Sequence, residues 1–261
     1  MDNVLDMIVK STRTRITEAQ RLHPLMELKQ KAESMDCNTG FPFYKALKGK
    51  DMAFICEVKK ASPAKGVIDE KFDFLEIAKE YEKAGADAIS CLTEPYYFLG
   101  SDEHLKQIAQ NVSIPVLRKD YTVSEYMIYE AKLLGAAAVV FNCSILKEGQ
   151  LEEYLELAHH LGLSALVETR TTEEGKKAVE AGAKIIGINN RDLESYVIDM
   201  NLSKELRSIV PEDCIFVSES GIQTPEDVVL LKKIGVDAVL VGETLMKAEN
   251  KTQTLHTLKG E

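Results

Sequence analysis

The sequence lacks the features that mark several classes of protein. No apolar run approaches the roughly 20 residues that a membrane-spanning helix requires, so a membrane protein is not indicated. Positive charge is also scarce, because 32 Lys and Arg residues stand against 42 Asp and Glu residues, for a net charge of −10. Nonspecific nucleic-acid binding needs a basic surface. The composition therefore argues against both nucleic acid and membrane as partners.

Cysteine is sparse and lacks functional spacing. No two of the five cysteines form a CxxC pair, so neither a zinc site nor a dithiol redox centre is indicated. The first 15 residues, MDNVLDMIVKSTRTR, have acidic residues within their apolar stretch and no small-residue cleavage site, so we expect no signal peptide. These absences predict reduced, buried thiols in a cytoplasmic protein. The cysteines are Cys37, Cys56, Cys91, Cys143 and Cys214.

Short apolar runs alternate with amphipathic stretches from residue 53 onward. A nearly continuous content of Val, Ile and Leu indicates strands that are buried on both faces, as in a parallel sheet. Eight such units in a chain of 261 residues predict an α/β fold, a (β/α)8 TIM barrel. The runs cover residues 53–58, 88–93, 115–119, 137–142, 164–168, 185–190, 215–220 and 238–242.

Signals for helix starts and helix ends between the runs fit this alternation. Thr122 with Glu125 and Thr171 with Glu174 have capping-box spacing, and Thr224 precedes a proline at a predicted helix start. Glycines in the segments 84–88, 134–138, 181–185 and 234–238 predict helix ends just before strands. An open doubly wound sheet is the alternative fold, but neither the GxGxxG nor the GxxxxGK motif occurs.

The first 50 residues precede the first predicted strand. Their apolar residues have helical spacing, and a proline interrupts the segment FPFYKAL. We predict an N-terminal helical extension over residues 1–50 that packs on a barrel domain formed by residues 51–261. The extension either covers an apolar end of the barrel or helps to close the active site, and the sequence does not separate these two roles.

Polar residues end most of the predicted strands, where the active site of this fold lies. Strand alternation places Glu57 and Lys59 on the same side and Cys56 on the other. Charges that end apolar barrel strands are costly unless they are paired or functional. The residues at the strand ends are Glu57, Lys59, Arg118, Lys119, Asn142, Glu168, Asn189, Arg191, Glu219, Ser220, Gly242 and Glu243.

No histidine ends a predicted strand, so acid–base chemistry falls to lysine and glutamate. A buried lysine beside other cations can have a lowered pKa, which would suit a general acid. A Schiff-base lysine, either Lys119 or Lys59, remains open. No cluster suggests a metal.

Two glycine-containing loops suggest a phosphate site. Gly221 and Gly242 follow the last two strands, where barrels often bind phosphate through backbone N–H groups. Ser62 and Lys65 follow the first strand. A positive mouth could then sit on an acidic body and attract an anionic substrate. Its predicted members are Lys59, Lys60, Lys65, Arg118, Lys119 and Arg191.

Several long motifs are similar to those of the indole-3-glycerol phosphate synthase family of tryptophan biosynthesis. They extend in order from about residue 40 to the C-terminus, and the N-terminal extension also fits that family. The motifs are EVKKASPAKGVI (57–68), LTEPYYFLGS (92–101), PVLRKDY (115–121), IIGINNRDL (185–193), VSESGI (217–222) and LVGETLM (240–246).

The resemblance implies a reaction and a set of roles. The family closes the pyrrole ring of 1-(2-carboxyphenylamino)-1-deoxyribulose 5-phosphate with loss of carbon dioxide and water, without cofactor or metal. Lys119 would protonate the substrate ketone oxygen, with Lys59 as a second candidate donor that also binds the anionic substrate. Glu168 would act in the dehydration. Glu57, supported by Glu219, would hold the lysines and the substrate in place.

The resemblance also implies the binding residues. Asn189 would hydrogen-bond the substrate near its reacting carbons, and Arg191 would order the site. Phosphate would be surrounded by Ser62, Ser220, Gly221, Gly242 and Glu243, and the aryl ring by Phe98, Tyr121 and Val140. Tyr121 stands where the family more often has phenylalanine. Asn142 interrupts a strand end that is usually aliphatic, which affects the expected shape of the aryl pocket.

Two other functions remain as alternatives. A phosphoribosylanthranilate isomerase-like barrel would need a cysteine base at the end of the first strand and an aspartate at the end of the sixth. Cys56 should face away from the site, and residue 189 is asparagine. A non-catalytic phosphate-binding barrel would not require Glu57, Lys119 and Glu168 together. In each case we expect a monomer with a small phosphorylated ligand.

Overall fold

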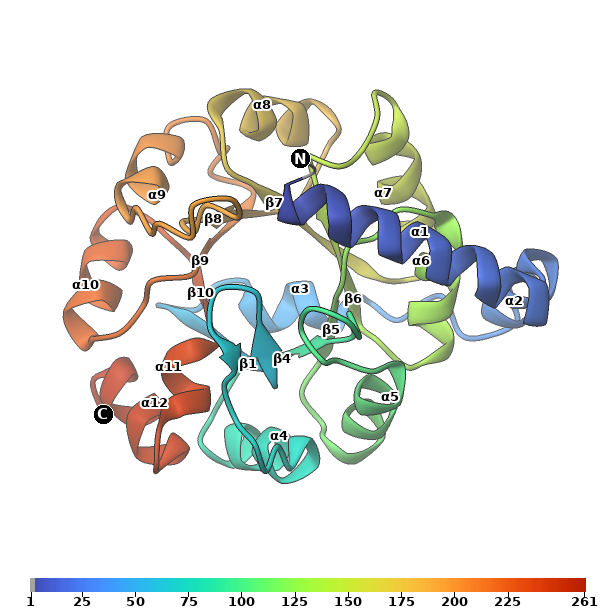
Figure 1. The fold of residues 1–261 in the computed structure, drawn as a ribbon. Helices are drawn as coiled ribbons and strands as arrows, with labels where there is room; N and C mark the ends of the chain where they lie inside the picture. Colours follow the sequence, from blue (N-terminus) through green and yellow to red (C-terminus); the bar gives the residue numbers. More distant parts are fainter. Residues whose placement is uncertain (1–2) are drawn as a thin grey trace.

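A closed barrel of eight parallel strands forms the centre of the molecule in the computed structural model, which describes residues 3–261. Strands follow one another around the barrel, and the last pairs with the first to close it (Figure 1). The predicted (β/α)8 fold is confirmed. The barrel strands are β1 (Ala53–Val58), β4 (Ala88–Leu92), β5 (Val116–Lys119), β6 (Ala138–Asn142), β7 (Ser164–Thr169), β8 (Ile185–Asn189), β9 (Ile215–Glu219) and β10 (Ala238–Val241).

Helices surround the barrel, and at least one follows every strand (Figure 1). The segment after β10 contains two helices, α11 (Glu243–Lys247) and α12 (Lys251–Lys259). A small antiparallel hairpin, β2 (Ala61–Ser62) with β3 (Gly66–Val67), lies in the loop after β1. The other helices of the ring are α4 (Phe74–Lys83), α5 (Asp102–Asn111), α6 (Glu125–Leu133), α7 (Gln150–His160), α8 (Thr172–Glu180), α9 (Asn201–Leu206) and α10 (Pro225–Lys233).

Strand alternation divides the apolar residues between two cores. Phe54, Cys56 and Val58 of β1 belong to the larger core between the strands and the helices. Ala53 and Ile55 belong to the smaller core inside the barrel. Because both faces of each strand are buried, the strands are continuous apolar runs rather than alternating ones. The inner face carries charge only near the carboxyl ends of the strands.

The observed helix N-caps match the capping residues predicted from the sequence, with one exception. Thr171 with Glu174 and Thr224 with Asp227 form capping boxes at the starts of α8 and α10. The prediction for Thr122 is wrong, because Ser124 caps α6 instead. The hydroxyl of Thr122 donates to the carbonyl of Val140 at 2.9 Å, so the side chain joins two neighbouring strand ends.

The N-terminal segment contains three helices: α1 (Val4–Leu22), α2 (Leu25–Glu33) and α3 (Pro42–Leu47). In Figure 1, α1 crosses in front of the barrel beside β6 and β7. Helix α2 packs along α6. Phe43 and Leu47 of α3 enter the inner core among the first residues of the strands, so α3 closes the opposite end of the barrel.

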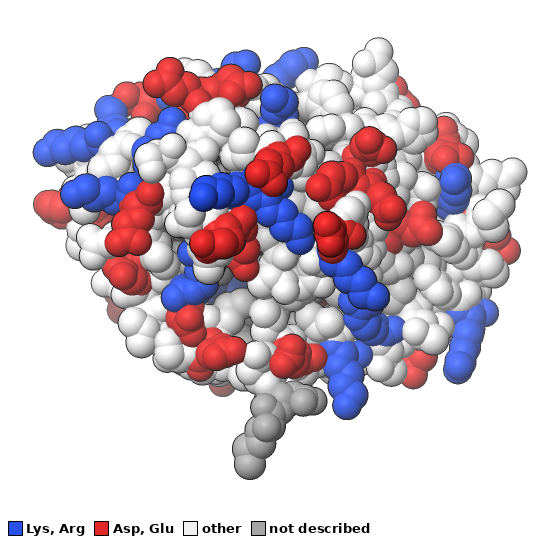
Figure 2. Space-filling view, turned by 90° about the horizontal axis from the view of Figure 1, so that it is seen from above, with Lys and Arg blue, Asp and Glu red and all other residues white. Residues whose placement is uncertain are grey.

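No helix within residues 3–261 is both long enough and apolar enough to span a membrane. Figure 2 shows one side of the molecule, on which acidic and basic side chains are interspersed and neither sign forms a continuous field.

Candidate active site

A cavity of about 430 Å³ opens where the carboxyl ends of the strands meet. All the residues to which the family resemblance assigns a role line it, together with apolar residues of α1. Convergence at this end follows from the parallel barrel, since every strand end points the same way. The predicted lining residues are Glu57, Lys59, Ser62, Phe98, Lys119, Tyr121, Val140, Glu168, Asn189, Arg191, Glu219, Ser220, Gly221, Gly242 and Glu243. Their individual roles stay predictions.

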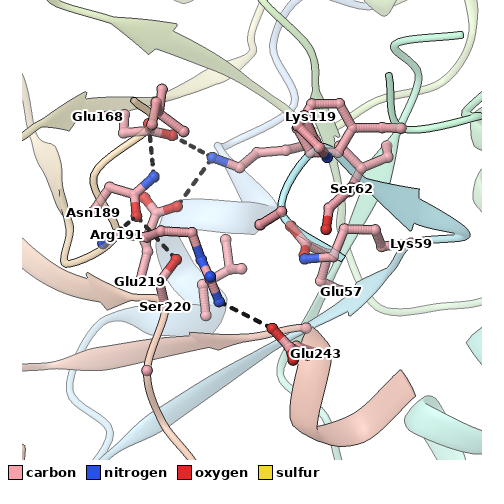
Figure 3. Close-up of a pocket in the computed structure, with 18 of the residues that line it drawn as sticks. Glu57, Lys59, Ser62, Lys119, Glu168, Asn189, Arg191, Glu219, Ser220 and Glu243 are labelled. Atoms are coloured by element: carbon pink, nitrogen blue, oxygen red, sulfur yellow. Dashed lines mark hydrogen bonds and ion pairs between the residues drawn. The ribbon is translucent and has the colours of Figure 1, made fainter. Parts of the chain in front are cut away.

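Lys119, the last residue of β5, lies between two carboxylates (Figure 3). Its Nζ donates to Oε2 of Glu168 and, at 3.0 Å, to Oε2 of Glu219. Burial lowers the pKa of Lys119, but Glu168, Glu219 and Glu57 together raise it well above the ordinary value. The expectation of a lowered pKa is therefore wrong for this arrangement, because the neighbours of Lys119 are acidic rather than basic.

Glu168 of β7 is the more strongly hydrogen-bonded of these two carboxylates. Besides the bond from Lys119, its Oε1 accepts from Nδ2 of Asn142 and Nδ2 of Asn189, each at 3.1 Å. Burial raises the pKa of Glu168, but the charge of Lys119 and the donated hydrogen bonds outweigh burial and lower it. Glu168 is consequently ionised at neutral pH.

Glu219 of β9 has the opposite environment. Its side chain is almost fully buried, and its Oε1 has no hydrogen-bond partner among the described residues. Burial is the largest cause of a pKa raised to about 7, to which the Glu168 carboxylate adds and which Lys119 opposes. A Cβ atom at Gly187 would lie 2.3 Å from Oε1 of Glu219, so the glycine of β8 makes room for this carboxylate.

Glu57 and Lys59 of the first strand end pair with each other, on the side that strand alternation predicts (Figure 3). Gly242 borders this pair closely. A Cβ atom at position 242 would lie 2.2 Å from Oε1 of Glu57 and 2.8 Å from Nζ of Lys59. The φ of Gly242 is −116°, so the residue is needed here for space rather than for an unusual backbone conformation.

Glu243, at the start of α11, forms ion pairs with cations from three segments of the chain. Its carboxylate contacts Arg191 at 3.0 Å, Lys247 at 2.7 Å and Lys65 at 3.4 Å. Burial raises the pKa of Glu243, but these three cations lower it overall. The carboxylate therefore faces cations, and only backbone groups of Glu243 are suited to contact a phosphate directly.

The loop after β9 has a tight backbone turn beside this cluster. Ser220 and Gly221 both have positive φ, at 68° and 91°. A Cβ atom at Gly221 would lie 2.6 Å from Sδ of Met200, so glycine is required there for conformation and for space. The Ser220 hydroxyl donates to Oδ1 of Asn189 at 2.9 Å, and the Thr244 hydroxyl donates to the carbonyl of Ile222 at 2.6 Å, which joins the two predicted phosphate loops.

Arg118 does not lie at the mouth, contrary to the prediction. Lys119 points into the barrel, so its neighbour Arg118 points outward into the core. There the guanidinium is 2.7 Å from both Asp102 and Glu130, and the residue is only 2% exposed. Lys60 is also absent from the cavity lining.

The prediction of a positively charged cavity mouth is therefore wrong. The charged lining residues are Glu57, Asp120, Glu168, Glu219 and Glu243 on the acidic side, and Lys59, Lys119, Arg191 and Lys247 on the basic side. Each of the four cations contacts a carboxylate of the lining: Lys59 contacts Glu57, Lys119 contacts Glu168 and Glu219, and Arg191 and Lys247 contact Glu243.

The apolar part of the cavity includes residues that the sequence did not reveal. Phe98 and Tyr121, both predicted for the aryl pocket, lie with ring centroids 6.2 Å apart. Val4, Leu5 and Ile8 of α1 also line the cavity. Their helical spacing is visible in the sequence, but nothing in it tells which end of the barrel α1 covers.

Two polar contacts hold α1 over the cavity. Nη2 of Arg15 lies 2.9 and 3.0 Å from the two carboxylate oxygens of Asp120, a buried residue next to Lys119. Nδ2 of Asn3 donates to Oε1 of Glu194 at 2.7 Å. The N-terminal extension thus has both of the roles considered for it: α1 helps to form the site, and α3 covers the other end of the barrel.

Within residues 3–261, no group of three or more His, Cys, Asp or Glu side chains has the arrangement of a metal site. Cys56 is fully buried in the core outside the barrel. It is therefore not placed to act as the base that an isomerase-like site would need.

Comparison with known proteins identifies close relatives. A family model described as indole-3-glycerol phosphate synthase matches residues 5–258. The protein of that name from Ruminiclostridium cellulolyticum is 48% identical over 257 residues, covering 98% of this chain and 99% of the relative. The protein of the same name from Leuconostoc mesenteroides is 46% identical over 260 residues, covering 99% of each chain.

Solved structures with low sequence identity share the fold alone. Thiamine phosphate pyrophosphorylase from Pyrococcus furiosus has a TM-score of 0.62 at 18% identity, covering 84% of this chain and 96% of the other. A 3-hexulose-6-phosphate synthase has a TM-score of 0.63 at 15% identity, covering 80% and 99%.

Proposed function

Because this chain belongs to the indole-3-glycerol phosphate synthase family, we propose that Lys119, Glu168 and Glu219 carry the proton transfers of the family reaction. The enzyme is a carboxy-lyase of tryptophan biosynthesis. It closes the pyrrole ring of 1-(2-carboxyphenylamino)-1-deoxyribulose 5-phosphate and releases carbon dioxide and water. One observation carries the proposal: a single buried lysine contacts two carboxylates whose pKa values are shifted in opposite directions.

In ring closure, the aryl carbon that bears the carboxylate attacks the substrate ketone carbon. Lys119 donates a proton to the ketone oxygen, which becomes a hydroxyl, while the aryl ring becomes a positively charged iminium. The raised pKa keeps Lys119 protonated at neutral pH. Protonation of Glu219, with its pKa of about 7, removes one negative neighbour and makes the ammonium group a stronger acid.

Decarboxylation then restores the aromatic ring, because the iminium accepts the electron pair of the breaking carbon–carboxylate bond. Dehydration follows. Glu168 is ionised and accepts the proton from the carbon next to the ring nitrogen. The electrons of that C–H bond form the new double bond. The hydroxyl leaves as water with a proton from Lys119, which after ring closure has taken up a proton from the protonated Glu219 that it contacts. In many active sites, a group with a raised pKa acts as the acid and a group with a lowered pKa acts as the base.

The remaining lining residues bind and orient the substrate. Phe98, Tyr121 and Val140, with α1, form the apolar wall for the aryl ring. Asn189 hydrogen-bonds the substrate near the reacting carbons, and Lys59 with Arg191 offers positive charge to its anionic groups. The loops that carry Ser220 with Gly221 and Gly242 with Glu243 surround the phosphate with Ser62, which is supported by the hydrogen bond that joins these loops.

We further propose a division of the chain into an extension of residues 1–50 and a catalytic barrel of residues 51–261. We also propose that the protein is a monomer. A cytoplasmic location is supported because all five cysteines are free thiols.

The function is tested by following fluorescent indole-3-glycerol phosphate as it forms from the carboxyphenylamino-deoxyribulose phosphate. We expect the unmodified protein to turn over, and Lys119→Ala to lose turnover while still binding substrate through its phosphate. Lys60→Ala serves as the matched control, because Lys60 is outside the cavity lining. An unmodified protein that binds this ligand tightly and forms no product would instead be a phosphate-binding barrel.

A further inference from the structure

Asn142, at the end of β6, hydrogen-bonds to Glu168 as well as lining the cavity. It is the direct strand partner of Glu168 and is 9% exposed. Its Nδ2 donates to Oε1 of Glu168 at 3.1 Å, the oxygen that also accepts from Asn189 of β8. Strands on both sides of β7 thus direct an amide at the same carboxylate oxygen.

The orientation of the Asn142 amide is fixed by its other end. Its Oδ1 accepts hydrogen bonds from the backbone N–H of Ser144, at 2.9 Å, and from the Ser144 hydroxyl. A flipped amide would direct its NH2 group at the Ser144 N–H and its oxygen at the Glu168 carboxylate, and both of these contacts are repulsive. The donor must therefore face Glu168.

We propose that Asn142 is a positioning residue for the known reaction, which holds the Glu168 carboxylate in place and stabilises its ionised form as the base for dehydration. The inference rests on the proposed role of Glu168. It also explains why the two carboxylates around Lys119 differ. Glu168 accepts from three side chains, whereas Glu219 accepts from Lys119 and keeps an unpartnered buried oxygen.

Removing the Asn142 donor makes ionisation of Glu168 less favourable, because a buried carboxylate then loses a hydrogen bond without gaining water. The base stays protonated to a higher pH, so the acidic limb of the kcat–pH profile shifts to higher pH. The expected shift is about one pH unit, the order of one charge-assisted hydrogen bond. Substrate binding changes less, because Asn142 acts through Glu168.

The test measures kcat and KM from pH 3.5 to 9 for the full chain, two Asn142 variants and one control variant. Asn142→Leu keeps the side-chain volume without a donor. Asn142→Asp keeps the shape and the Ser144 contacts, so it preserves folding while it directs a second carboxylate oxygen at Glu168. We expect the acidic limb of the kcat–pH profile to shift to higher pH in Asn142→Leu, and to shift further in Asn142→Asp. Ser144→Ala is the matched control and should shift little, since the backbone N–H of Ser144 still holds the amide.

An unchanged acidic limb in both Asn142 variants, with effects only on KM or thermal stability, would overturn the inference and leave Asn142 as part of the pocket wall. Failure of the proposed function has a different signature. Glu168→Gln would then retain the activity and the pH profile of the unmodified enzyme. If Glu168→Gln is inactive, the response of the Asn142 variants decides the inference alone.

Discussion

At the scale of single residues, the site is organised by unequal hydrogen bonding of similar groups. Glu168 and Glu219 are both buried glutamates in contact with Lys119, yet their pKa values move apart. The difference comes from donors: Asn142 and Asn189 bond to Glu168, while one oxygen of Glu219 has none among the described residues. A raised carboxylate pKa is a cost to the folded state, and this cost depends on pH.

We predict that Glu219→Gln makes the enzyme more stable above neutral pH. Below about pH 4.5, Glu219 is protonated in both the folded and the unfolded chain. Between 4.5 and about 7, the folded state holds the proton that the unfolded state has released, so stability falls as pH rises. Above 7 the full penalty remains, on the order of 3 kcal/mol for a shift of this size. The variant lacks this penalty.

Urea unfolding at pH 5, 6, 7 and 8 measures the effect. The advantage of Glu219→Gln over the unmodified protein should grow through this range and then level off. Glu226→Gln, at an exposed position of α10, is the control and should show no such trend. A constant difference between Glu219→Gln and the unmodified protein at all four pH values would mean that Glu219 titrates normally.

At the scale of helices and strands, the sequence predicts the barrel well because each strand has the same local signature. Burial on both faces makes the strands apolar runs, and the polar residue that ends each run marks the active-site end. The sequence alone therefore predicts the positions of Glu57, Lys119, Glu168, Asn189 and Glu219 at the active-site end. Strand alternation, applied consistently, would also have placed Arg118 on the outer face.

Contacts between distant elements could not be predicted in this way. Which end of the barrel α1 covers depends on Arg15 reaching Asp120, which is 105 positions away in the sequence. Thr122 has capping-box spacing, yet the neighbouring strand offers it the carbonyl of Val140 as an acceptor. Likewise, the neighbours of Lys119 come from three other strands, so the sign of its pKa shift was not visible from its own motif. Tertiary contacts decide each of these features.

Helix α1 is expected to depend on the Arg15–Asp120 ion pair for its position over the cavity. Arg15→Gln removes the cation from a buried carboxylate, so α1 should loosen from the mouth. Because Val4, Leu5 and Ile8 then line the cavity less tightly, KM should rise by roughly tenfold, the equivalent of about 1.5 kcal/mol for one charged hydrogen-bonded contact. Steady-state kinetics and hydrogen exchange of α1 measure the two effects.

Arg13→Gln is the matched control, since Arg13 lies on the same helix and is exposed. It should leave both KM and exchange unchanged. Faster exchange of α1 in Arg15→Gln with an unaltered KM would show that the helix is anchored by this pair but does not shape the binding site.

At the scale of the whole molecule, the N-terminal segment contacts both ends of the barrel. Helix α1 reaches the cavity at the carboxyl ends of the strands, α2 runs along α6, and α3 inserts Phe43 and Leu47 among the starts of the strands. The same segment therefore lines the cavity at one end of the barrel and completes the inner core at the other. Changes at the two ends should have separable effects, with stability affected at one and substrate binding at the other.

Phe43→Ala tests this separation at the α3 end. Phe43 is fully buried in the inner core, so its truncation should destabilise the protein by about 3–5 kcal/mol through lost burial and the cavity left behind. Values of kcat and KM below the melting range should stay at those of the unmodified enzyme, because the change lies at the closed end of the barrel. Met26→Ala, at a 74% exposed position of α2, should change stability by no more than about 0.5 kcal/mol. If Phe43→Ala instead raised KM while leaving the urea midpoint in place, the floor of the barrel would be coupled to its mouth and the two ends would not be independent.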